Sequence, residues 1–158
     1  MKILEAQSAV LTNYEVFTHL NANEKRHPRY GREGGRPRNL VTVTKELLEY
    51  FSDAPSPLAS EPFPYQEETI RILLEKLRCW DFTKAEIIMI INLRPTKPEN
   101  LNTVIEEMDS RFPEEDTQAE ICAAIMGVLG QPNGEAENAA KRGTVLDNQA
   151  GEAGTMAD

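Results

Sequence analysis

Very few residues in this chain have the types and spacing that catalysis or metal binding requires. The two histidines, His19 and His27, have no histidine or cysteine partner at a spacing typical of metal ligands. The glycine-rich stretch GREGG at 31–35 lies in a loop of arginine and proline and matches no phosphate-binding fingerprint. Acidic pairs such as Glu106–Glu107 are sequence neighbours, which fits helix surfaces better than a shared acid–base site. The sequence therefore predicts a protein that is not an enzyme and that holds no metal or cofactor.

The two cysteines lie within apolar helical patterns. We expect Cys79 and Cys122 to be small buried side chains instead of a disulfide or a metal site. A reducing compartment, the cytosol or the nucleus, follows from this use of cysteine. We expect no signal peptide at the N-terminus, and the longest apolar run, IIMII at 87–91, is too short to cross a bilayer.

A basic loop at 24–38 interrupts an otherwise acidic chain of net charge −9. Its prolines and glycines disfavour regular structure. The loop could contact RNA, DNA or an acidic partner, or it could be a solvated loop without a fixed role. Tyr30 is the only aromatic residue among the basic ones, so stacking on single-stranded nucleic acid has little support. The basic candidates for such a contact are Lys25, Arg26, Arg29, Arg32, Arg36 and Arg38.

The segment before residue 52 combines two short strand-like runs with helical patterns. KILEA at 2–6 and LVTVT at 40–44 predict short strands, and the second run leads into a short helix, KELLEYF, with Thr44 as its N-cap. Between them, SAVLTNYEVFTHL places apolar residues at helical spacing. This stripe either packs on a core of its own or docks on a partner. Strands too few for a stable sheet could complete a sheet in another chain.

A proline- and serine-rich linker at 52–64 separates this segment from a helical one. Four helices are predicted over 65–130. The second begins with the capping box Thr83–Glu86 and should be the most buried. The third should run from a Thr96 cap to Arg111, and the fourth should end at Gly130. The tail at 131–158 is expected to be disordered. The fold class predicted is mainly α, with one or two short N-terminal strands.

Three motifs in fixed order resemble a known family. These are Asn13–Phe17 (NYEVF), Thr83–Glu86 (TKAE) and Asn92–Pro95 (NLRP), within a similarity that covers about residues 1–130. Together they resemble the small stalk subunit of eukaryotic RNA polymerase III, also called the calcitonin-gene-related-peptide receptor component protein (CRCP) family. The tail and the basic loop do not contribute to this resemblance.

The resemblance implies a non-catalytic subunit of a nuclear polymerase. The family has an N-terminal tip-associated domain, here 1–51, and a C-terminal HRDC-like helical domain, here 65–130. It forms a heterodimer with an OB-fold stalk subunit and contacts polymerase core subunits and initiation factors. It supports transcription initiation of tRNA, 5S rRNA and other small RNAs. Any contact with RNA is expected to be indirect or weak, and no membrane contact is expected.

Candidate residues for the partner-binding face combine the helical stripe with the two strand-like runs. They are Ile3, Leu4, Val10, Leu11, Tyr14, Phe17, Val41 and Val43. Arg94, beside the Arg-Pro corner, either contacts the polymerase or a factor or caps the helix before it. Two other functions remain open: a nucleic-acid-binding HRDC module with a basic arm, and a receptor-associated signalling accessory protein.

Overall fold

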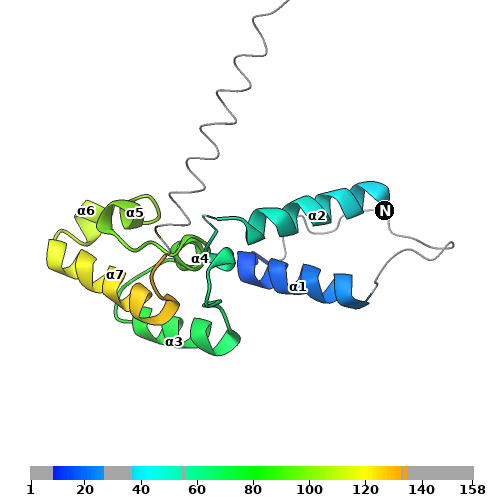
Figure 1. Ribbon diagram of the computed structural model, residues 1–158. Helices are drawn as coiled ribbons and strands as arrows, with labels where there is room; N and C mark the ends of the chain where they lie inside the picture. Colours follow the sequence, from blue (N-terminus) through cyan, green and yellow to red (C-terminus); the bar gives the residue numbers. More distant parts are fainter. Residues whose placement is uncertain (1–8, 27–36, 55, 133, 135–158) are drawn as a thin grey trace, which may run out of the picture.

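The computed structural model describes residues 9–26, 37–54, 56–132 and 134 (Figure 1). Within these residues the fold is helical, and no strand is present. The elements are α1 (Asn13–Arg26), α2 (Arg38–Ser52), the 3-10 helix η1 (Pro57–Ala59), α3 (Glu67–Leu77), α4 (Lys84–Leu93), α5 (Pro98–Asn102), α6 (Met108–Arg111) and α7 (Glu115–Leu129). Helices α1 and α2 lie side by side and run in opposite directions, and we call this pair the hairpin. We call helices α3 to α7 the helical body (Figure 1).

Helix α1 begins later than the apolar stripe predicted. The Thr12 hydroxyl accepts a hydrogen bond from the Glu15 backbone N–H at 3.2 Å, and the Glu15 carboxylate accepts one from the Thr12 backbone N–H at 2.7 Å. This reciprocal pair is a capping box, which satisfies two backbone donors at the start of a helix. Val10 and Leu11 therefore precede the helix instead of belonging to its stripe.

Helix α2 replaces the predicted second strand. The prediction of a strand at 40–44 and of an N-cap at Thr44 is wrong, because both lie inside one helix that begins at Arg38. β-Branched residues lower helix propensity only slightly, and burial of a helical face overrides that preference. Here the face ends in the fully buried Phe51. The other predicted strand, at 2–6, lies outside the described residues.

Helix α4 lies on the side of the helical body that faces the hairpin (Figure 1). Its N-terminal capping box is confirmed: the Glu86 N–H donates to Thr83 Oγ1 at 3.3 Å and the Thr83 N–H to a Glu86 carboxylate oxygen at 2.7 Å. Figure 1 looks nearly along this helix, with the hairpin on one side and the other body helices on the opposite side. Ile90 and Ile91 are buried in the core.

The predicted third helix is broken in two. Helix α5 begins after Lys97 instead of Thr96, with Pro98 in its first turn, and ends at Asn102. The Thr103 hydroxyl donates to the Asn100 carbonyl at 2.7 Å, a local bond typical of residues that end helices. Helix α6 starts only after Glu107, whose φ of 51° is left-handed. The apolar spacing persists across the break, because Leu101, Ile105 and Met108 are all buried.

The core of the helical body lies where α7 packs against α3 and α5. Its fully buried side chains include Leu73, Ile121 and Ile125. Helix α7 ends at Gly130, as predicted, with a φ of 74° that glycine adopts without strain. Cys122 is buried, as predicted, whereas the prediction for Cys79 is wrong: its thiol lies exposed after the last turn of α3. Within the described part of the chain, no helix is long and apolar enough to cross a membrane.

Candidate interaction surface

Several large apolar side chains are exposed on the hairpin and in the segment just before it. Val43 and Tyr50 on α2 are 58% and 64% exposed, and Leu11, just before α1, is 56% exposed. Leu40 and Val10 are about half exposed. Single exposed apolar residues are ordinary, but a group on one small unit is typical of a protein-contact surface.

Helix α2 has an apolar face wider than α1 can cover. Phe51 is buried and Leu47 half-buried, and both belong to the face turned into the molecule. Val43 and Tyr50 are seven residues apart, so they lie about two turns apart on the same side of the helix. They flank the buried face and remain open to solvent. A partner that contacts this side would extend the apolar packing that α2 has already begun.

Two of the predicted partner-binding residues, Tyr14 and Phe17, bury part of their surface against other residues of this chain. Tyr14 lies 6.0 Å from the Tyr65 ring in a stacked arrangement, and Phe17 meets Phe51 edge to face at 6.1 Å. Both also contact Phe63, which itself contacts Tyr65. We call these five rings the aromatic cluster. Tyr14 and Phe17 are half-buried, so only the rest of their surface is open to another chain.

The remaining predicted site residues are spread over the hairpin and its surroundings. Val41 is half-buried in α2, beside the exposed Val43. Among the basic positions, Lys25 and Arg38 are exposed near the far end of the hairpin, and Arg26 is the last residue of α1. Ile3, Leu4, Arg29, Arg32 and Arg36 lie outside the described residues. Sequence reasoning missed Leu40 and Tyr50 because reading 40–44 as a strand concealed the helical register that joins them.

The C-terminal turn of α4 binds three separate segments. The Ile91 carbonyl accepts a hydrogen bond from the Tyr65 hydroxyl at 2.8 Å, and Asn92 Oδ1 accepts one from the Asn13 backbone N–H at 2.8 Å. Arg94 ends the helix in a left-handed conformation, so its predicted capping position is confirmed. Its guanidinium donates to the Leu129 carbonyl at 3.3 Å and to the Ser60 hydroxyl at 3.0 Å.

Burial governs the chemistry of this turn. Arg94 is only 6% exposed, which leaves little of its side chain for a contact with another molecule. Desolvation raises the pKa of the Tyr65 hydroxyl to about 12, so this group stays protonated and donates its hydrogen bond at all physiological pH values.

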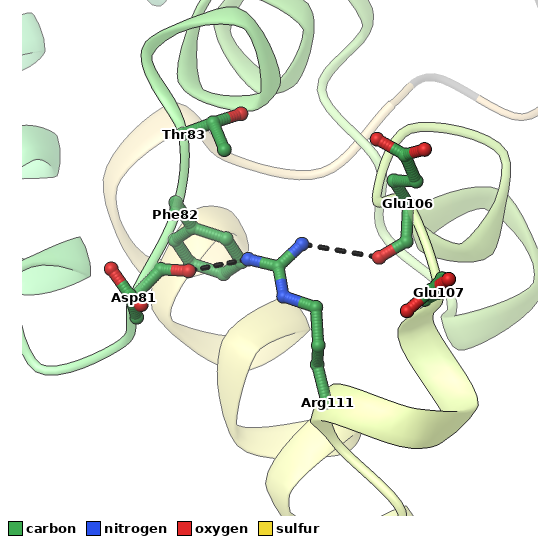
Figure 2. Close-up of a pocket in the computed structure, with 6 residues that line it drawn as sticks. All are labelled: Asp81, Phe82, Thr83, Glu106, Glu107 and Arg111. Carbon is green, nitrogen blue, oxygen red and sulfur yellow. Dashed lines mark hydrogen bonds between the residues drawn. The ribbon is translucent and has the colours of Figure 1, made fainter.

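A polar hollow of about 450 Å³ opens between α4 and α6 (Figure 2). It is lined by Asp81, Phe82, Thr83, Glu106, Glu107 and Arg111. The Arg111 guanidinium points between the two walls and donates to the Asp81 and Glu106 carbonyls (Figure 2). It also forms an ion pair with Glu86, which is not one of the lining residues. Arg111 is thus engaged by several groups of its own chain, and 28% of its side chain remains exposed.

The Glu86 carboxylate is held in its charged form. Desolvation raises its pKa, but hydrogen bonds from Arg111, Thr83 and the Glu106 backbone N–H outweigh it and bring the pKa to about 2. A carboxylate of that pKa is neither an acid nor a base near neutral pH. Among the described residues, no group of three or more His, Cys, Asp or Glu side chains is placed to hold a metal ion. We therefore interpret the hollow as a structural feature of the packing between the start of α4 and helix α6.

Comparison with known proteins defines the class of this helical protein. Residues 10–127 match the model of the RNA polymerase Rpb4 family, and the chain belongs to this family. It is 37% identical over 123 residues to "DNA-directed RNA polymerase III subunit rpc9" of Schizosaccharomyces pombe, covering 73% of this chain and 90% of that protein. It is 28% identical over 160 residues to "DNA-directed RNA polymerase III subunit RPC9" of Saccharomyces cerevisiae, covering 80% of this chain and 99% of that protein.

Proposed function

We propose that this chain is a non-catalytic subunit of DNA-directed RNA polymerase III. The observation that carries the proposal is the similarity to two proteins named as subunits of that polymerase, each covered over at least 90% of its length. Sequence similarity over nearly the whole length of a relative supports a shared role better than similarity over one motif. The nucleus is the compartment that follows from this role.

In this proposal the chain forms the stalk heterodimer with a larger OB-fold subunit and supports initiation of tRNA, 5S rRNA and other small RNA genes. The hairpin, within the tip-associated segment 1–51, supplies the main contact with the larger subunit. The helical segment 65–130 acts as an HRDC-like domain that contacts core subunits or initiation factors.

The exposed side of α2 supports this assignment. The Tyr50 ring lies 5.6 Å from that of the buried Phe51, and Val43 lies about one turn before the half-buried Leu47, so a partner covering Val43 and Tyr50 would join an apolar surface that already continues into the core. Burying two such side chains stabilises a complex by roughly 3 kcal/mol before the costs of association.

Strand addition to a sheet of the partner would use the two strands that the sequence predicts at 2–6 and 40–44. Because 40–44 is helical, the second of these strands does not exist. The contact proposed here is therefore made by helix faces.

Affinity purification of the tagged full chain from nuclear extract tests this proposal. Quantitative mass spectrometry should recover RNA polymerase III core subunits together with the OB-fold stalk subunit. The variant Val43→Asp should reduce that recovery about tenfold, because a charge at the contact must be desolvated without a partner.

The matched control is Ile72→Asp, which places the same charge at an exposed β-branched residue on α3. This variant should recover the polymerase as the unmodified chain does. Absence of polymerase III subunits with the unmodified chain would refute the function. Equal losses from both variants would leave the function standing and refute the α2 contact.

A further inference from the structure

The end of α4 is one of the places where the hairpin is attached to the helical body, beside the buried Phe51 of α2. Asn13 is the first residue of α1, and its N–H is one of the backbone donors that a helix start leaves without an intrahelical acceptor. That donor is bonded to Asn92 Oδ1, across 79 positions of sequence. The amide oxygen is the only atom of the Asn92 side chain that can accept, so the donor fixes the orientation of the amide.

A second attachment lies one residue later in α1 and one residue earlier in α4. Tyr14, next to Asn13, stacks on the Tyr65 ring, and the Tyr65 hydroxyl donates to the carbonyl of Ile91, next to Asn92. Tyr65 is only 2% exposed, so its ring has little room to move. One attachment point would leave the hairpin free to rotate about it. Two points leave only rotation about the line that joins them, and the buried Phe51 of α2 opposes that rotation.

Arg94 ties the same turn of α4 to the rest of the body. A left-handed conformation at a residue other than glycine costs about 1 kcal/mol. Here the buried guanidinium binds the last carbonyl of α7, at Leu129, and the Ser60 hydroxyl in the segment that follows η1. The turn that holds the hairpin is therefore itself held from two sides.

We propose that Asn92 is a positioning residue that fixes the direction in which the hairpin presents the exposed side of α2. The inference rests on the proposed function for its purpose, because a fixed direction matters when that side docks on a partner. The test is independent of that function, because it uses the isolated full-length chain.

Hydrogen exchange followed by mass spectrometry tests the attachment. In Asn92→Ala, amides in the first half of α1 should exchange about tenfold faster, because one hydrogen bond at the helix start is lost. Amides in α3 and α7 should be unchanged. Asn92→Asp keeps an acceptor oxygen beside a helix N-terminus and should match the unmodified chain. Unchanged exchange of α1 in Asn92→Ala, or equal acceleration in every helix, would overturn the inference.

A distance measurement tests the direction itself. Spin labels are placed at two exposed positions, Glu46 on α2 and Glu75 on α3, in a Cys79→Ser background. The distribution of label distances should be narrow in that background, broader after Asn92→Ala and narrow again after Asn92→Asp. Identical distributions in all three would contradict a positioning role. Neither result depends on whether the chain binds a polymerase, so failure of this inference and failure of the proposed function can be told apart.

Discussion

Glu86 shows how much one side chain contributes beyond its local role. Thr83 and Glu86 form a capping box that the sequence alone predicts from the spacing of threonine and glutamate. The same carboxylate also binds the Arg111 guanidinium and the Glu106 backbone N–H, at 3.2 Å for the latter. It thereby holds the irregular turn between α5 and α6 against the start of α4. That second role could not be predicted, because nothing in a sequence pairs residues 25 positions apart in different helices.

Replacing Glu86 by Gln should lower the free energy of unfolding at pH 7 by roughly 2 kcal/mol, because it removes the charge that Arg111 binds. The folded-state pKa lies below the ordinary value of 4.5, at about 2. The stability that Glu86 contributes is therefore complete above about pH 4.5 and is lost as the pH falls towards 2. Urea unfolding between pH 7 and pH 2.5 measures both effects.

The difference in stability between the Glu86→Gln variant and the unmodified chain should shrink as the pH falls through this range. Glu75→Gln, at an exposed position on α3, is the control. It should change neither the free energy of unfolding at pH 7 nor the dependence of that free energy on pH. A difference between Glu86→Gln and the unmodified chain that stays constant from pH 7 to pH 2.5 would contradict this account of the ion pair.

At the scale of elements, the sequence predicts helices well where apolar periodicity and caps agree. Helices α3, α4 and α7 have both an apolar stripe and a recognisable start or stop, and each lies about where it is predicted. The prediction of a strand at 40–44 is wrong because β-branched residues favour strands, whereas the apolar spacing that continues to Phe51 is helical. The prediction of a single third helix is wrong because the apolar spacing continues across the break at 103–107.

The helical state of 40–44 makes a prediction that a strand would not. Val43 lies in the interior of α2 and is well exposed, so Val43→Ala should raise the free energy of unfolding of the isolated chain by about 0.5 kcal/mol, through better helix propensity. Val43→Gly should lower it by a similar amount. Thermal and urea unfolding measure both. A loss of stability in Val43→Ala would indicate that this residue packs in a strand or in the core.

At the scale of the whole molecule, the predicted linker takes part in packing. Leu58 and Tyr65, at and just after the 52–64 segment, belong to one core cluster with Phe51 and the body helices. The aromatic cluster and the Asn13–Asn92 bond then connect the hairpin to that core. The sequence supplied the motifs NYEVF and NLRP, but their pairing through Asn13 and Asn92 became visible only in three dimensions. The division into 1–51 and 65–130 stays a prediction.

The most direct measurement for the central claim is site-specific photo-cross-linking from the exposed side of α2. Tyr50 is 64% exposed and its ring lies 5.6 Å from that of Phe51, so p-benzoylphenylalanine at this position keeps an aromatic ring beside Phe51 and extends into solvent. The same label at the exposed Glu75 on α3 is the matched control. After irradiation of the purified polymerase III assembly, the label at position 50 should be found attached to the larger stalk subunit, and the control label should not. A chain that enters the assembly but cross-links to that subunit only from α3, or from neither position, would contradict the α2 contact.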